Sequence, residues 1–122
     1  MSKSVVTVFV LLLALQLHAS TLASTSSRES VLVLGDSLSA AYGVAIDSGW
    51  VALLQQHLQQ AGHPVEVFNA SISGETTQGG LARLPDLLTR HRPDVVVIEL
   101  GANDGLRGFP LHLIRANLAQ MV

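Results

Sequence analysis

The sequence predicts an α/β fold in which a parallel β-sheet carries helices on both faces. Three short apolar runs, at residues 31–34, 65–68 and 95–98, have the composition of buried strands. A stretch with helical spacing of apolar residues follows each run. This alternation of strand and helix is typical of parallel sheets built from crossover units.

The first third of the predicted fold is one strand and one helix. The run at 31–34 is continuously apolar and ends at Gly35, as expected of a strand buried on both faces. Asp47 or Ser48 can cap the helix that follows, and Gly62 can end it. The apolar face of this helix is predicted from residues at helical spacing: Trp50, Leu53, Leu54, His57, Leu58 and Ala61.

Two more strands and two more helices are predicted downstream. The strand at 65–68 leads to a helix over 77–90, in which Pro85 either kinks the helix or marks its true first turn. The strand at 95–98 leads to a helix that begins near Pro110 and continues to Val122. One face of the helix over 77–90 is predicted to hold four leucines: Leu81, Leu84, Leu87 and Leu88.

Right-handed crossovers place the first strand between the second and the third. Ligands in such sheets bind at the carboxyl ends of the strands, near the point where the strand order reverses. We therefore expect the polar sequences after the strands to face one crevice. These sequences are Gly35-Asp36-Ser37, Ser71-Ile72-Ser73-Gly74 and Gly101-Ala102-Asn103-Asp104.

Ser37 is the candidate nucleophile of this crevice. A serine hydroxyl needs a base to take its proton, and the oxyanion that it creates needs preorganised donors. The Ser37 N–H, the Gly74 N–H and the Asn103 side-chain amide are three such donors at three strand ends. Each of these short sequences alone is also an ordinary turn or helix cap, so the argument rests on their joint placement. Ser39 replaces the second glycine of G-x-S-x-G, which disfavours an ordinary α/β-hydrolase.

Three ordered blocks of this sequence resemble the SGNH, or GDSL, hydrolase family. Val33-Leu34-Gly35-Asp36-Ser37-Leu38-Ser39 resembles the GDSL block, and Asn69-Ala70-Ser71-Ile72-Ser73-Gly74-Glu75-Thr76-Thr77 the glycine block. Glu99-Leu100-Gly101-Ala102-Asn103-Asp104-Gly105-Leu106-Arg107-Gly108 resembles the asparagine block, and Leu81-Ala82-Arg83-Leu84-Pro85 strengthens the match. The resemblance extends from about Val31 to Val122 and is specific to the bacterial periplasmic branch of thioesterases, arylesterases and lysophospholipases.

The resemblance implies an ester and thioester hydrolase that works through an acyl-enzyme on Ser37. It implies that the Ser37 amide, Gly74 and Asn103 form the oxyanion hole, and that no metal or organic cofactor takes part. The implied fold is a flavodoxin-like three-layer α/β/α domain, of which this chain holds the N-terminal part with three strands. The expected partner is a small acyl ester or thioester, and the complete protein is expected to be a monomer.

The sequence departs from the family pattern in two ways. Ala41 stands where relatives often have glycine, a difference expected to be minor. The Asp-x-x-His block that supplies the catalytic base and its orienting acid is missing, so the chain is expected to be truncated. The histidines beyond the apolar leader are interpreted as structural or solvated: His57, His63, His91 and His112.

Residues 1–23 are expected to be a signal peptide, and residues 24–122 the N-terminal part of one hydrolase domain. Lys3 precedes an apolar run at 5–15, and Thr21-Leu22-Ala23 places small residues at the two positions that a signal peptidase reads. The run is shorter than the ~20 residues of a membrane span. An uncleaved anchor and a lipoprotein signal are the alternatives, but the latter needs a cysteine and the chain has none. The mature protein is thus expected in the periplasm or outside the cell.

Composition is that of a globular protein, with 48% hydrophobic and 13% charged residues. A formal net charge of −2 without any basic run disfavours nucleic-acid binding. Two alternatives to a working hydrolase remain open. One is a phosphate- or metal-binding module of receiver type that uses Asp36, Glu99 and Asp104. The other is a decayed or truncated hydrolase that keeps only a binding role. Leu106, Phe109 and Leu111 suggest an apolar wall for an acyl chain, or else core.

Overall fold

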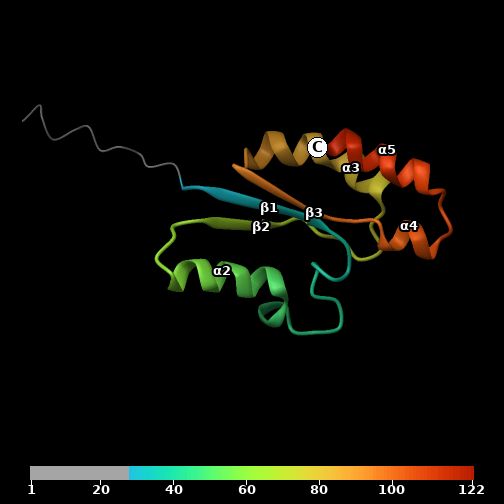
Figure 1. Ribbon diagram of the computed structural model, residues 1–122. Helices are drawn as coiled ribbons and strands as arrows, with labels where there is room; N and C mark the ends of the chain where they lie inside the picture. The colour runs from blue at the N-terminus through green and yellow to red at the C-terminus, as the bar shows by residue number, and fades with distance from the viewer. Residues whose placement is uncertain (1–27) are drawn as a thin grey trace, which may run out of the picture.

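The computed structural model describes residues 28–122, which form one parallel sheet between two layers of helices (Figure 1). The predicted signal peptide lies outside the described residues. The strands are β1 (Ser30–Gly35), β2 (Glu66–Asn69) and β3 (Val95–Glu99). The helices are the 3-10 turn η1 (Ile46–Ser48), α2 (Trp50–Gln60), α3 (Thr77–His91), α4 (Ala102–Leu106) and α5 (Leu111–Met121).

The strand order is β2-β1-β3, and both pairings are parallel. Val31 is opposite Val67 in β2 and opposite Val95 in β3, so the central strand carries neighbours on both sides. This order confirms the prediction from right-handed crossovers. All three strands therefore end at the same edge of the sheet.

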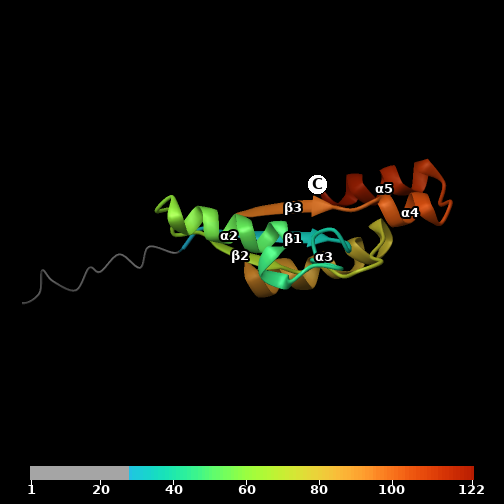
Figure 2. The same ribbon diagram turned by 90° about the horizontal axis from the view of Figure 1, so that it is seen from below.

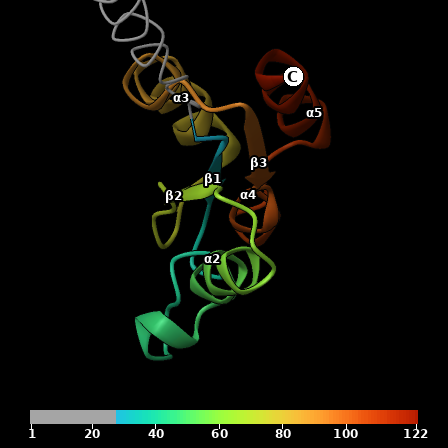
Figure 3. The ribbon, with the colours of Figure 1, turned by 90° about the vertical axis from the view of Figure 1, so that its left-hand side faces the viewer.

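Helix α2 covers one face of the sheet, whereas α3 and α5 lie on the other (Figures 1 and 3). Leu32 and Leu34 of β1 pack with Leu84 and Leu87 of α3 in the core, and Val33 is also fully buried. Because successive residues of a strand point to opposite faces, burial of all three requires cover on both sides. Cover on both faces explains why β1 is a continuous apolar run. The predicted three-layer α/β/α fold is confirmed.

The predicted apolar face of α2 is confirmed only in part, at the half-buried Leu54 and Leu58. Val51 is buried and Leu58 is half-buried, whereas Trp50 is 38% exposed, Leu53 is 50% exposed and His57 is exposed. The buried stripe includes the polar Gln55, whose side chain binds the β2 backbone. Its Nε2 donates to Val65 O at 2.8 Å, and its Oε1 accepts from Val67 N at 2.8 Å. Apolar spacing alone therefore selects the neighbouring stripe, which contains more hydrophobic residues.

The predicted cap of α2 is also wrong. Asp47 and Ser48 belong to η1, and the N-cap is Gly49, which has no side chain to accept a hydrogen bond. Figure 2 shows α2 lying along the sheet in the view from below.

Helix α3 begins where the sequence predicts and continues through Pro85. Thr76 caps it by accepting a hydrogen bond from Gly79 N at 3.2 Å. Pro85 therefore does not mark the first turn, and Leu88 is 39% exposed rather than part of the buried face. Within residues 28–122, no helix is both long and apolar enough to cross a membrane.

Candidate active site

The three polar sequences meet at the carboxyl end of the sheet, as predicted. Ile72 N donates to Gly35 O at 3.0 Å, which joins the segment after β2 to the end of β1. Asn103 Nδ2 donates to Asp36 Oδ2 at 3.1 Å and to Glu75 O at 2.9 Å. One side chain after β3 thus contacts the segments after both other strands.

Ser37 lies in a tight turn directly after β1. Asp36 is 2% exposed, and its Oδ1 accepts from Leu38 N at 3.0 Å, so its carboxylate closes the turn around Ser37. Ala40 N donates to Asp36 O at 2.9 Å, and Tyr42 N donates to Ser37 O at 3.1 Å. Across the described part of the chain, neither the Ser37 N–H nor its hydroxyl has a hydrogen-bond partner. Both groups are therefore available to a ligand.

The turn rests on a buried hydrogen-bond chain that runs through Ser39. Trp50 Nε1 donates to Ser39 Oγ at 3.1 Å, and Ser39 Oγ donates to Glu99 Oε2 at 2.9 Å. The Asn69 side chain donates to Ser39 O at 2.7 Å. A Cβ on Gly35 would lie 2.6 Å from Ser39 Oγ, so the close approach of this turn requires glycine there. Neither Trp50 nor Asn69 is predicted from the sequence to support this turn.

Gly74 has φ +81°, a conformation in which glycine is favoured over any residue with a Cβ. Asn103 is the second residue of α4, which begins after Gly101 with φ +124°. Only the amide nitrogen of Asn103 can satisfy the two oxygen acceptors that it faces, which fixes the orientation of this side chain. The short helix α4 was not predicted, because the sequence was interpreted as a polar loop.

A second buried cluster fixes α4 against α3. Asp104 is 1% exposed and Thr77 is fully buried. The Asp104 carboxylate accepts from Thr77 N at 2.9 Å and from Thr77 Oγ1 at 2.6 Å, and Asn117 Nδ2 donates to Thr77 Oγ1 at 3.0 Å. Because Asp104 follows Asn103 directly, this cluster also determines where Asn103 lies.

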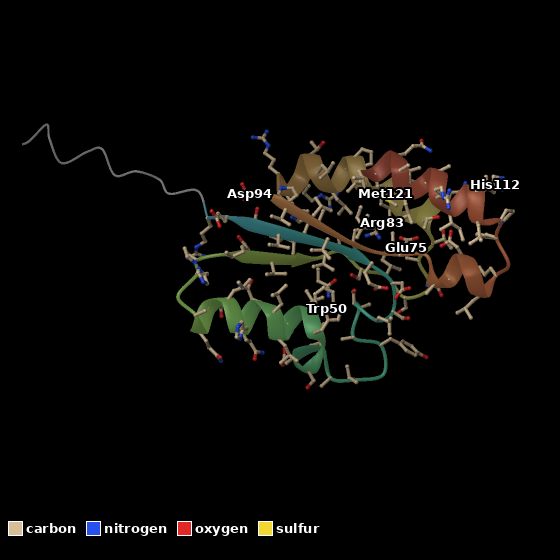
Figure 4. The ribbon with its side chains drawn as sticks, viewed as in Figure 1. Trp50, Glu75, Arg83, Asp94, His112 and Met121 are labelled. Carbon is tan, nitrogen blue, oxygen red and sulfur yellow. The ribbon has the colours of Figure 1, made fainter. Side chains whose placement is uncertain are left out.

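An ion pair supports the glycine segment from the side of α3. Arg83 donates to Glu75 at 2.9 Å and to Ala70 O at 2.8 Å, and the two charged side chains lie side by side in Figure 4. These contacts hold the segment between β2 and α3 at both of its ends.

The sequence model of the GDSL-like lipase/acylhydrolase family matches residues 33–122. The chain belongs to this family. The matched range begins in β1 and includes the turn around Ser37, the segment around Gly74 and α4.

Named relatives of this GDSL-like family member are esterases and thioesterases. An arylesterase from Vibrio mimicus is 54% identical over 111 residues, which are 91% of this chain and 56% of the relative. Thioesterase 1/protease 1/lysophospholipase L1 from Escherichia coli K12 is 47% identical over 97 residues, which are 80% of this chain and 45% of the relative. The chain spans about half the length of the curated relatives it matches.

Solved structures show the same fold. The crystal structure of TesA superimposes with a TM-score of 0.75 at 56% sequence identity, over 76% of this chain and 52% of that chain. The likeness therefore extends over most of the residues that the structure describes here.

None of the four described histidines of this GDSL-like chain lies at the crevice. His57 and His63 are exposed on and after α2, and the ring of His91 packs on Phe68 with centroids 4.4 Å apart. His112 is exposed on α5 (Figure 4). Their interpretation as structural or solvated agrees with these positions.

Proposed function

We propose that this chain forms the nucleophile and oxyanion-binding half of a serine hydrolase that cleaves carboxylic esters and acyl thioesters. The observation that carries the proposal is the hydrogen bond of Asp36 to Asn103, because it places the candidate nucleophile turn beside a candidate oxyanion donor. Membership of the GDSL-like family and the printed names of the relatives support the same reaction class.

In this proposal the Ser37 hydroxyl oxygen attacks the carbonyl carbon of the substrate while a base takes the hydroxyl proton. The tetrahedral intermediate expels the alcohol or thiol and leaves an acyl group on Ser37, which water then removes. The base and its orienting acid would come from the Asp-x-x-His block of the family, which this sequence does not contain. Like the family, the proposed reaction needs no metal or organic cofactor.

The oxyanion would be bound by the Ser37 N–H, the Gly74 N–H and the Asn103 amide. Both hydrogens of Asn103 Nδ2 already have acceptors. Binding of the oxyanion to Asn103 therefore requires one of these two hydrogen bonds to be shared or redirected.

The substrate is proposed to carry an apolar acyl chain. Leu106 is 85% exposed, Leu111 is 81% exposed and Phe109 is 39% exposed, so these three residues are not core in this structure. They lie on or next to α4, the helix that carries Asn103. Exposed apolar side chains on and after α4 fit the acyl portion of an ester or thioester.

The structure gives less support to a phosphate- or metal-binding module. The carboxylates of Asp36, Glu99 and Asp104 accept hydrogen bonds from separate neighbours in the protein. They do not form a group of ligands in the part of the chain that the structure describes. Magnesium titration remains the direct test, since only this alternative predicts binding.

Export to the periplasm or the medium is part of the proposal and rests on the sequence of residues 1–23. Mass spectrometry of the exported protein is expected to give an amino terminus at or near Ser24. Intact Met1 in the membrane fraction would instead identify the segment as an anchor.

The decisive test of the function is Ser37→Ala in the complete gene product. Esterase activity on short acyl esters is expected to disappear while the circular dichroism spectrum stays unchanged. A serine-directed phosphonate is expected to modify Ser37 alone. Modification of the exposed Ser73 or the buried Ser39 would contradict the assignment.

A further inference from the structure

The side chains of Asn103 and Arg107 hold two successive carbonyl groups of the glycine segment. Asn103 Nδ2 donates to Glu75 O at 2.9 Å, and Arg107 Nη2 donates to Gly74 O at 3.0 Å. The two residues are four positions apart, a spacing that puts side chains on the same face of a helical turn. Together they fasten the end of α4 to the segment between β2 and α3.

Arg107 is also bonded to Asn103 through the backbone. Its N–H donates to Asn103 O at 3.0 Å, where Arg107 ends α4. Arg107 therefore contacts both Gly74 and Asn103, the two residues outside the turn around Ser37 that are proposed to supply oxyanion donors. The guanidinium lies close to the open side of Gly74, since a Cβ built there would be 3.6 Å from Arg107 Nη2.

Gly74 needs such support because glycine has more backbone freedom than any other residue. Its φ of +81° is held by contacts with its neighbours, since it has no side chain of its own. A charge-assisted hydrogen bond from a guanidinium is stronger than one between neutral groups. Fixing the Gly74 carbonyl restrains rotation about the Cα–C bond of Gly74, and the Gly74 N–H lies in the peptide on the other side of the same Cα. Arg107 therefore limits the backbone movement of the residue that carries this N–H.

We propose that Arg107 is a positioning residue of the oxyanion hole, which it stabilises by holding Gly74 in its left-handed conformation next to Asn103. The proposal rests on the proposed hydrolase function. Donors that are already oriented toward the developing charge stabilise a transition state without having to reorganise. Arg107 therefore acts on the turnover rate rather than on substrate affinity.

The competing role for an exposed arginine is direct binding of an anionic substrate. A guanidinium has five N–H donors and Gly74 uses one of them, so the two roles predict different kinetics. A positioning residue lowers kcat by the same factor for neutral and anionic substrates. An anion-binding residue raises KM for anionic substrates alone.

The test compares Arg107→Met, which keeps an apolar stem and removes every donor, with Arg107→Lys, which keeps one charged donor. Both are assayed in the complete gene product on a neutral p-nitrophenyl ester and on an acyl-CoA thioester. We expect Arg107→Met to lower kcat about 10-fold on both substrates, in the range that small misplacements of catalytic groups cost. KM is expected to change little, and Arg107→Lys is expected to recover part of the loss.

The matched control is Arg90→Met, which removes an exposed arginine in the last turn of α3. It is expected to keep the wild-type kcat. Thermal melting confirms that each variant is folded, and the rate of phosphonate labelling of Ser37 is expected to fall in parallel with kcat. An unchanged kcat in Arg107→Met, or a rise in KM confined to the thioester, would overturn the proposal.

Ser37→Ala in the same series separates this inference from the proposed function. If Ser37→Ala keeps its activity, the hydrolase assignment itself is wrong. If Ser37→Ala is inactive and Arg107→Met is normal, only the role of Arg107 is rejected.

Discussion

Asn103 Nδ2 donates a hydrogen bond of 3.1 Å to Asp36 Oδ2, although the two residues are 67 positions apart in the sequence. The same Asp36 carboxylate accepts from Leu38 N, so one buried group holds both the turn around Ser37 and the amide of Asn103. The carboxyl ends of β1 and β3 therefore keep a fixed relation at the crevice. Displacement of either residue displaces the other.

Replacement of Asn103 by alanine is expected to lower kcat of the complete gene product by ~10²–10³, the usual effect of losing one oxyanion donor. KM is expected to change little, because the contact strengthens in the transition state. Gln120→Ala is the control, since it removes an exposed side-chain amide of α5 whose hydrogen bond is to Ala116 O of the same helix, and it is expected to keep kcat. A loss confined to KM would mean that Asn103 only binds substrate. Steady-state kinetics on a short acyl ester measure both variants.

Ala41→Gly is expected to stabilise the protein. Ala41 has φ +59°, a left-handed conformation that is costly for a residue with a Cβ. Glycine removes this strain from the folded state but also adds conformational entropy to the unfolded chain. The first effect is the larger one, so the free energy of unfolding is expected to rise by about 0.5 kcal/mol. Ala40→Gly is the control, since Ala40 is not among the described residues with positive φ, and it is expected to destabilise. Urea unfolding measures the change in the free energy of unfolding for each variant. Equal changes for Ala41→Gly and Ala40→Gly would show that Ala41 is not strained.

Gly49→Ala is expected to destabilise the protein by about 1–3 kcal/mol, the usual cost of an overpacked contact. Gly49 has an ordinary φ of −70°, so the cost arises from a Cβ that would lie 2.6 Å from the Cβ of Ala41. In the double variant with Ala41→Gly this contact is absent, and most of the stability should return. A double-mutant cycle measures the coupling, and strictly additive effects would show that the two positions do not meet.

A protein made of residues 24–122 is expected to hydrolyse esters only weakly. The four described histidines lie on α2, after α2, on α5 or in contact with Phe68, and none is placed to take the Ser37 proton. Without a base, the oxyanion donors alone give ~10³–10⁴-fold over water, far below a working serine hydrolase. Comparison of this segment with the complete gene product on a p-nitrophenyl ester measures the difference. Equal turnover would assign the base to one of these four residues.

The order and pairing of the strands could be predicted from the sequence because both follow from general rules. A run such as that of β1 is apolar throughout only if both faces of the strand are covered, and crossover handedness then places β1 in the centre. The positions of Ser37, Gly74 and Asn103 at one edge follow directly, since parallel strands share their carboxyl edge.

Contacts between polar side chains could not be predicted in the same way. The stripe of α2 was predicted only in part, because the half-buried Gln55 is held against β2 by two hydrogen bonds rather than by hydrophobicity. The chain from Trp50 through Ser39 to Glu99 depends on distances between three segments, and no local pattern encodes these distances. The strain at Ala41 was underestimated because a residue type does not reveal its φ.

The Gln55 side chain donates to Val65 O and accepts from Val67 N, and this pair of hydrogen bonds bears on self-association. They use a carbonyl and an N–H at the beginning of β2, on the side of the sheet that has no further strand among the described residues. Exposed groups of this kind are the template on which another chain adds a strand and aggregation begins. The Gln55 amide occupies them much as the backbone of a neighbouring strand would. An intruding chain would first have to displace this side chain, so Gln55 of α2 blocks strand pairing at the beginning of this border.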